Sequence, residues 1–404
     1  MYRPKALTTK VFILSFLLLL GLSNQMNGQK KEARKVFPID YNTAFIDITG
    51  RVVIRASQTE LQNAVDRISS KLGRFNGPAP ESWITFDEFS EGFAVTHWTL
   101  CPKCCDPGWV DGFIDESGRL VIPPPNFLSR YGSFHEGLAK YSDKGWGFIN
   151  REGRIVIPAK FYEASDFSEG LSVVRVSEKH KFGYINQKGE LAIPSQFDWA
   201  RDFHGGLAAV KLSKDKYGFI DKTGKVVLSE REWRDVGDFS EGLAAVKAEG
   251  TDNGVYVGSK TENYGYIDRT GKFVIAPLFD RVQEFSEGRA LFFQTGKNPG
   301  YGFIDLKGKV VIKPEFEDAK SFSEGLAAVA IKSSGDKKLW GYINEEGQWV
   351  IKPQFQNVDS FNGGLAAVNC DEYGANCKAY IDREGKIGWQ AHGLTGGNNF
   401  RDER

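Results

Sequence analysis

The chain has 404 residues, with 52 basic and 52 acidic side chains and with thirty Phe against only two Met. A neutral chain with interspersed charges gives no electrostatic basis for binding nucleic acid or anionic lipid. So many aromatic residues with so little methionine favour a rigid β core over an adaptable helical surface.

Residues 1–28 are predicted to be a secretory signal peptide. Arg3, Lys5 and Lys10 precede an apolar run from Val11 to Leu22, which is short for a membrane span. Removing the signal takes away three basic and no acidic residues, so the charge becomes 49 − 52 = −3. No later stretch approaches the length of a membrane helix. We therefore expect a secreted or periplasmic, cell-envelope protein without integral membrane insertion after signal removal.

Residues 57–73 are predicted to form a short amphipathic helix. Ser57 and Glu60 have the spacing of a capping box, and Gly73 would end the helix. Apolar residues between them recur at helical spacing, at Leu61, Ala64, Val65, Ile68 and Leu72. This helix would cover the first edge of the structure that follows.

The rest of the chain, residues 37–390, is a tandem repeat. A Gly, an aromatic residue, Ile and then Asp or Asn recur in copies that start at Gly112, Gly147, Gly183, Gly218, Gly265, Gly302 and Gly341. Variants with a leading Ala start at Ala44 and Ala379, and the steps from Gly112 to Ala379 are 35, 36, 35, 47, 37, 39 and 38 residues. A period of this size indicates a solenoid, a propeller or another stacked array. We expect about eight units and a partial first unit.

One unit can be followed from Phe203 to Phe239 as three antiparallel strands. A strand opened by a Gly turn leads to a second strand, Tyr217–Ile220, and a turn from Asp221 to Gly224 leads to a third, Lys225–Leu228. The opening phrase, Phe-x-Glu-Gly or Phe-x-Gly-Gly, occurs eight times, at Phe89, Phe134, Phe167, Phe203, Phe239, Phe285, Phe322 and Phe361. Such a unit cannot bury its own apolar face, so neighbouring units must pack against each other.

Two arrangements satisfy this requirement. The fold class is expected to be all-β, an array of three-stranded antiparallel meanders in an open solenoid. The alternative is a closed propeller of seven or eight blades, which could use the segment 198–201 as a fourth strand and would bring the first and last units into contact. Residues 391–404, rich in Gly and Asn, are expected to form a flexible tail.

Two repeated acidic positions are predicted to be structural. Asp and Asn interchange after the Ile, as at Asp221 and Asn186, and an Asx turn needs a side-chain oxygen but no charge. Glu in the opening phrase is replaced by Gly205 and Gly363 in two units, which argues against a catalytic acid. We interpret these glutamates as turn-capping carboxylates.

Cysteines fall in two local groups, at Cys101, Cys104 and Cys105 and at Cys370 and Cys377. In an oxidising compartment Cys370 and Cys377 would bridge one hairpin, and one of the other three would remain unpaired. A four-thiolate zinc site is the competing interpretation, which the loose spacing of Cys370 and Cys377 disfavours. We expect disulfides, no metal and no cofactor.

The chain resembles the bacterial WG-repeat family, named for the aromatic-Gly pair that opens the second strand. The literal pair occurs at Trp146-Gly147 and Trp340-Gly341, and softer versions at Tyr217, Tyr264, Tyr301 and Phe182. Asp111-Gly112 and Lys378-Ala379 depart from the pattern. The resemblance spans residues 37–389 and implies an all-β repeat region without an assigned role.

The function expected from these features is binding rather than catalysis. Five aromatics at one repeated position, Trp146, Tyr217, Tyr264, Tyr301 and Trp340, would form a ladder for sugar rings or peptide if exposed, or a seam between hairpins if buried. We expect an exported non-enzymatic scaffold for protein or cell-wall glycan. The alternatives are a structural spacer, or a hydrolase with a loop-built site near His97 and Asp106.

Overall fold

The computed structural model describes residues 37–39, 44–47, 51–55, 60, 63–64, 84–99, 109–123, 130–214, 216–249, 251–252, 255–256, 262–296, 299–333, 337–369 and 378–390. Residues 36–404 form one unit, and residues 1–35 form another that lies outside the described part. The expected signal peptide, the tail at 391–404 and all five cysteines also lie outside the described residues.

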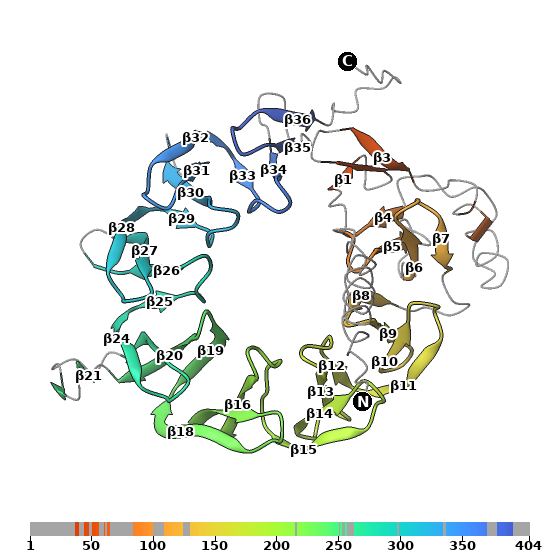
Figure 1. Cartoon of the computed structure of the whole chain (residues 1–404), viewed down its shortest axis with the longest axis horizontal. Coiled ribbons are helices and arrows are strands. Elements are labelled where there is room, and N and C mark those ends of the chain that lie inside the picture. The colour runs from red at the N-terminus through yellow and green to blue at the C-terminus, as the bar shows by residue number, and fades with distance from the viewer. Residues whose placement is uncertain are drawn as a thin grey trace, which may run out of the picture. The chain divides into compact units, whose positions relative to one another are not determined.

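The described strands form small antiparallel sheets that follow one another in chain order (Figure 1). The first sheet has three strands, β1 (Phe37–Ile39), β2 (Ala44–Ile46) and β3 (Val52–Arg55). The next three have four strands each: β4 (Ile84–Phe86), β5 (Phe93–Thr99), β6 (Trp109–Asp115) and β7 (Leu120–Ile122); β8 (Tyr131–His135), β9 (Leu138–Ser142), β10 (Trp146–Asn150) and β11 (Ile155–Phe161); β12 (Glu163–Ala164), β13 (Leu171–Arg175), β14 (Phe182–Asn186) and β15 (Leu191–Phe197).

The remaining sheets repeat this order. They contain β16 (Leu207–Ser213), β17 (Lys216–Asp221) and β18 (Val226–Trp233); β19 (Asp235–Ser240), β20 (Leu243–Glu249), β23 (Glu262–Ile267) and β24 (Phe273–Phe279); β25 (Arg281–Val282), β26 (Arg289–Gln294), β27 (Gly300–Asp305) and β28 (Val310–Phe316); β29 (Asp318–Ala319), β30 (Ala327–Lys332), β31 (Lys338–Ile343) and β32 (Trp349–Phe355); β33 (Asn357–Val358), β34 (Ala366–Asn369), β35 (Lys378–Ile381) and β36 (Ile387–Gln390). A separate hairpin, β21 (Thr251–Asp252) and β22 (Val255–Tyr256), lies between β20 and β23.

The sheets from β4 to β36 form an eight-bladed β-propeller, which is the second of the two expected arrangements. The sheet β1–β3 connects its ends: Ala44 and Ile46 share an apolar cluster with Leu365 and Tyr380, and Phe45 contacts Phe89. First and last sheets therefore touch, as a closed arrangement requires, and the open solenoid is incorrect. The physical reason is that each short twisted sheet presents two apolar faces, and closure leaves none of them uncovered.

The strand that carries the repeated Gly-aromatic-Ile motif, which is the third strand of the four-stranded sheets, shows this two-sided packing. In β10, Phe148 and Ile149 point to opposite faces, and both are almost fully buried. Ile149 shares an apolar cluster with Phe113 of the preceding sheet, whereas Phe148 packs with Phe167 of the following one. Alternation along a strand thus joins three consecutive blades.

The glycine of the repeated aromatic-Gly pair allows two strands to approach closely. A Cβ at Gly183 would lie 2.7 Å from the Ile193 carbonyl oxygen and 2.8 Å from the Ser195 nitrogen of the outer strand. The pairing of β14 and β15 shifts register at this point. A side chain cannot be accommodated there, because backbone rather than a movable side chain occupies the space.

Each interface between successive sheets, called a seam below, contains the Phe of the opening phrase. Its ring meets an aromatic ring of the preceding sheet at centroid distances of 4.8 to 5.0 Å in the pairs Phe45–Phe89, Phe113–Phe134, Phe148–Phe167, Tyr184–Phe203, Phe219–Phe239, Tyr266–Phe285, Phe303–Phe322 and Tyr342–Phe361. These rings bury the apolar faces of neighbouring units against each other, as the sequence analysis requires.

Two local expectations can also be compared with the structure. Ala200 bridges to Val210, so the segment 198–201 supplies the fourth strand position of the β16–β18 sheet. Of the helix expected at 57–73, only Glu60, Asn63 and Ala64 are described, and these three have helical backbone. The remainder of that segment lies outside the described residues, and the helix stays a prediction.

Candidate functional site

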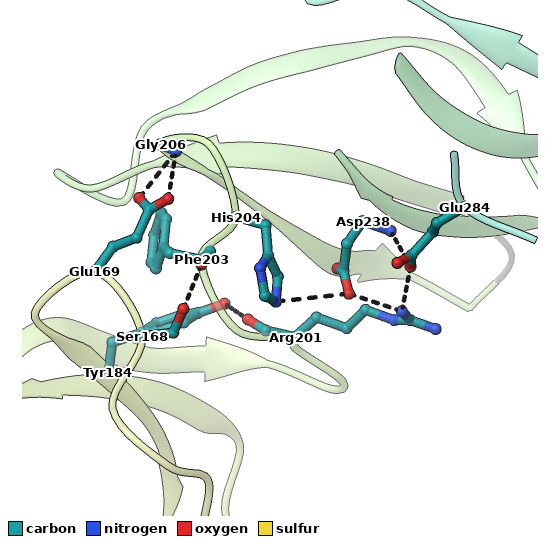
Figure 2. A network of polar contacts seen from close by, with 9 residues as sticks. All are labelled: Ser168, Glu169, Tyr184, Arg201, Phe203, His204, Gly206, Asp238 and Glu284. Carbon is teal, nitrogen blue, oxygen red and sulfur yellow. Dashed lines mark hydrogen bonds and ion pairs between the residues drawn. The ribbon is translucent and has the colours of Figure 1, made fainter. Parts of the chain in front are cut away.

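The glutamates of the opening phrase lie at hairpin tips and fasten consecutive blades together. Glu91, Glu136, Glu169, Glu241, Glu287 and Glu324 all have positive φ, between 52° and 56°. The carboxylate of each one accepts a backbone N–H from the equivalent turn of the next blade. In Figure 2 this contact runs from Gly206 to Glu169, at 2.9 Å. We call it the carboxylate clamp. The glutamates do cap turns, as the sequence predicts, but each one caps the turn of the next blade and not its own turn.

The clamp receives further support from the residue that follows the Asx position of the next blade. Arg151 binds Glu91, and Lys222 binds Glu169 at 3.1 Å. Burial acts to raise the pKa of both glutamates, but these cations and the turn N–H groups outweigh it and hold each pKa below its usual value. The carboxylates are therefore ionised when the clamp forms.

The clamp is missing at the two blades that carry Gly in place of Glu. After Gly363 comes the sheet β1–β3, which has no Glu-Gly hairpin to receive a carboxylate, and Asn362 instead donates to Glu88 of β4–β7 at 3.2 Å. After Gly205 comes a normal turn at Glu241-Gly242. Ring closure thus explains the first exception but not the second.

The seam that follows Gly205 holds a network of charged side chains instead. The Arg201 Nη1 lies 2.9 Å from Asp238 Oδ2 and 3.6 Å from Glu284 Oε1, and it thereby links three consecutive blades (Figure 2). His204, which replaces the usual Ser, lies 3.9 Å from Asp238. Tyr184 donates to the Arg201 carbonyl oxygen at 2.8 Å and fixes the arginine backbone.

A cleft of about 510 Å³ lies against this network. The segment 198–201, strands β19, β20, β23 and β25 and the segments that follow β25 and β29 contribute its lining, which is Arg201, Asp235, Val236, Gly237, Ala245, Tyr264, Val282, Gln283, Glu284, Phe285, Ser286 and Ser321. Tyr264 donates to Asp235 at 2.7 Å, and Ser321 donates to Gln283 at 2.8 Å. These bonds fix polar groups of both signs in position.

The lining is suited to hydrogen bonding. Burial, and then the hydrogen bond to Asp235, raise the pKa of Tyr264, so the phenol stays protonated and remains a donor. The described lining includes two serines, but no His, Lys or Cys that could activate them. Such a cleft can hold main-chain amides or polar side chains of a ligand.

The five residues of the expected aromatic ladder lie inside their own sheets. Trp146, Tyr217, Tyr264 and Tyr301 are half-buried, and Trp340 is buried. Each is paired with an aromatic residue of the outer strand, in the pairs Trp146–Phe161, Tyr217–Trp233, Tyr264–Phe279, Tyr301–Phe316 and Trp340–Phe355. Lysines lie over the first three of them at 5.6 to 5.8 Å. Tyr264 is the one that lines the cleft, and ligand stacking on the others stays a prediction.

His97 occupies the place of such a lysine in the β4–β7 sheet, and Asp111 occupies the place of the aromatic residue. The His97 Nδ1 lies 3.0 Å from Asp111 and its Nε2 lies 2.9 Å from Asp87. Hydrogen bonds to Asp111 and Asp87 raise the pKa of His97 to about 9, despite its burial. Asp111 also accepts the Tyr131 N–H of the next blade at 2.8 Å. A protonated histidine held in this way is a structural cation rather than a general base. Asp106, its expected partner in a hydrolase, lies outside the described residues.

Three further features can be checked in the described part of the chain. Within those residues no group of His, Cys, Asp and Glu side chains is arranged to hold a metal ion. No described helix has the length and apolar character needed to cross a membrane. The repeated Asx side chains form turns, since Asp221 and Asn186 both accept N–H groups two and four residues further along. Asp and Asn are equivalent in this role, as the sequence predicts.

Reasoning from sequence missed Arg201, Asp235, Gln283 and Glu284 as site residues. Each lies on or beside the innermost strand of its sheet, one to four residues before the Phe of a seam. The spacing of these residues along the sequence does not distinguish them from their neighbours. One sequence feature could have indicated the site. His204-Gly205 replaces the usual Ser-Glu of the opening phrase, although the next unit keeps the usual Glu241-Gly242 turn.

The fold and the seam geometry define a β-propeller built from repeats. The family model described as WG containing repeat matches residues 112–145, 146–179, 182–216, 217–251, 264–297, 301–333 and 340–373. The chain therefore belongs to the WG-repeat family. A search of curated proteins finds no match.

Solved structures with a similar fold have little sequence in common with the chain. BamB from Moraxella catarrhalis is 9% identical, with a TM-score of 0.38, over 72% of this chain and 92% of BamB. Dipeptidyl peptidase 4 from Porphyromonas gingivalis is 8% identical, with a TM-score of 0.45, over 89% of this chain and 58% of the peptidase. Apo AztD from Citrobacter koseri is 12% identical, with a TM-score of 0.33, over 66% of this chain and 82% of AztD.

Proposed function

We propose that the protein is an exported, non-enzymatic scaffold that binds a protein ligand at the cleft beside Arg201. The observation that carries this proposal is the seam after Gly205, where the carboxylate clamp is absent and a charged network that links three blades lies next to a cleft of about 510 Å³. A seam that served only to hold blades together would keep the clamp that six other blades have.

A protein ligand fits the lining better than a glycan does. Sugar rings are held by exposed aromatic faces, whereas the repeated aromatics here are half-buried or buried and three of them lie under lysines. The cleft offers Gln283, Ser321, Tyr264 and carboxylates at its surface, which match the amides and charged side chains of a polypeptide. Export is supported by the basic, then apolar, N-terminal sequence.

The test compares wild type with the double variant Arg201→Ala/Gln283→Ala. Each purified protein is immobilised and exposed to envelope proteins, to peptidoglycan and to a panel of soluble glycans. We expect retention of an envelope protein that falls at least about tenfold in the variant, or about 1.4 kcal/mol. The control is Lys188→Ala, an exposed change on the β14–β15 turn. Equal retention by the double variant, or retention of glycan alone, would contradict the proposal. Fractionation of cells that express the chain with and without residues 1–28 tests export.

A further inference from the structure

The hairpin tips of this protein are carboxylate-binding sites, as six internal examples show. Two consecutive residues with positive φ direct their backbone N–H groups to one side of the turn, and such an arrangement binds anions. The clearest case is the turn at Glu324-Gly325, where both N–H groups donate to Glu287, at 2.7 and 2.8 Å. The ligand chemistry of this turn is therefore established within the chain itself.

The turn at Glu241-Gly242 has the same conformation without the same ligand. Its φ values are 52° and 85°, close to those of the other tips. The preceding blade carries Gly205 where the clamping glutamate would be, and among the described residues no carboxylate accepts the Gly242 N–H. Gly242 is exposed, so the N–H can be reached from solution.

Arg269 completes this turn as a potential site. It occupies the same position after the Asx residue as Arg151 and Lys222, both of which bind the clamping carboxylate of their seam. The Arg269 Nη2 lies directly beside the position that a Cβ on residue 205 would take, and the guanidinium carbon is 5.9 Å from the centroid of the Phe239 ring. The side chain is exposed and forms no ion pair within the described part of the chain. A cation thus stands in the space that a glutamate fills elsewhere.

We propose that Gly242 and Arg269 form an external carboxylate site, which takes an Asp or Glu side chain of the partner protein into the place that the chain's own glutamate fills at other seams. This inference deepens the proposed binding role, because it names one contact of the ligand. A protein carboxylate is favoured over the carboxylate of an acidic glycan because every occupant seen in the six internal copies is a glutamate side chain.

The turn at Glu91-Gly92 provides an internal negative control. It also follows a sheet without a clamping glutamate, and Gly92 has a φ of 86°. Its blade carries Glu116 at the position of Arg269, and the Glu116 Oε1 lies 3.9 Å from the place of a Cβ on Gly92. A carboxylate approaching Gly92 would be repelled, whereas one approaching Gly242 would be attracted.

The experiment is a titration of the full chain labelled with 15N-glycine. The probe is glutamate blocked at both ends, with blocked glutamine as the neutral control. We expect the Gly242 amide resonance to shift with a dissociation constant on the order of 10 mM, with no response at Gly92 and with a much weaker effect of blocked glutamine. Arg269→Ala should weaken the binding at least about fivefold.

A second variant separates the site from general effects of mutation. Gly205→Glu should supply the internal carboxylate, because six glutamates already adopt this backbone conformation, and should abolish the response of Gly242 to the probe. The matched control is Gly363→Glu, whose seam faces a sheet without a Glu-Gly or Gly-Gly pair in its sequence and which should leave the response of Gly242 unchanged.

The outcomes distinguish this inference from the proposed function. No shift at Gly242, an equal shift with blocked glutamine, or a shift that persists in Gly205→Glu would overturn the site, while capture of a partner through the cleft could still hold. A stronger response to glucuronate than to blocked glutamate would overturn the assignment to a protein side chain. Loss of partner capture in Gly205→Glu but not in Gly363→Glu would support the site within the whole protein.

Discussion

The seams after Gly205 and Gly363 both have Gly in place of the clamping Glu, but the structural context of the replacement differs between them. After Gly363 the chain meets the three-stranded sheet that closes the ring, and the sequence of that sheet lacks the Glu-Gly or Gly-Gly pair of a receiving turn. After Gly205 the receiving turn is present, Arg269 lies beside the place of the missing carboxylate, and Arg201 and His204 lie near Asp238 in the same seam. The comparison teaches that the role of a residue that departs from the repeat can be inferred only when the turn it faces in the next sheet is known.

The largest effect should come from the aromatic contacts, which both kinds of seam share. Phe322→Ala, at a clamped seam, and Phe239→Ala, at the seam after Gly205, should each lower the free energy of unfolding by about 3 to 5 kcal/mol, since both rings are buried. Urea denaturation measures the change. A much smaller loss for Phe239→Ala would show that the two seams differ in their cores as well as in their clamps.

The next effect concerns the seam between β4–β7 and β8–β11, where charge supplements the clamp. Asp111 and Asp87 raise the pKa of His97 from 6.5 to about 9, so protonation stabilises the fold below pH 6.5, and this contribution disappears as the pH rises through 9. The full shift corresponds to about 3 kcal/mol, and solvent around the half-exposed Asp87 screens part of it, which leaves about 2 to 3 kcal/mol.

His97→Gln should therefore be less stable than wild type at pH 6, and the difference should shrink by pH 10. Denaturation curves at several pH values test this prediction. His180→Gln serves as control, because that histidine is exposed. A difference that grew with pH would have the wrong sign for a histidine that is protonated in the fold.

A smaller effect is expected from one carboxylate clamp. Glu287→Ala removes an acceptor of two N–H groups and should lower the free energy of unfolding by about 2 kcal/mol, a value typical of hydrogen bonds to a charged group. Glu346→Ala, at an exposed turn, is the control. If both variants were equally stable, the clamp would not distinguish the regular seams from the seam after Gly205.

The smallest effect on stability should follow Arg201→Ala. Its ion pairs with Asp238 and Glu284 are partly exposed, so their loss should cost at most about 1 kcal/mol, while partner binding falls. The loss of stability and the loss of binding are compared by measuring thermal unfolding and partner binding on the same samples. A loss of several kcal/mol would place Arg201 among the structural residues and remove the distinction between the cleft and an ordinary seam.

The sequence by itself determined the repeat, its antiparallel strands, its Asx turns and the need of neighbouring units for each other. These properties are local, since hydrophobic alternation and turn residues act over a few positions. The recurrence of Phe, Gly and Ile was therefore sufficient to predict the unit and its family.

Only the tertiary structure decided that the array closes and that the glutamates act between blades. Closure depends on the small rotation between successive sheets, which no single repeat encodes, and on contacts between Ala44 and Tyr380 at opposite ends of the chain. The partners of each clamp are 34 to 47 residues apart, so their meeting requires the blades to be stacked. For the same reason, the cleft beside Arg201 could not be recognised from spacing, because its residues come from four consecutive blades.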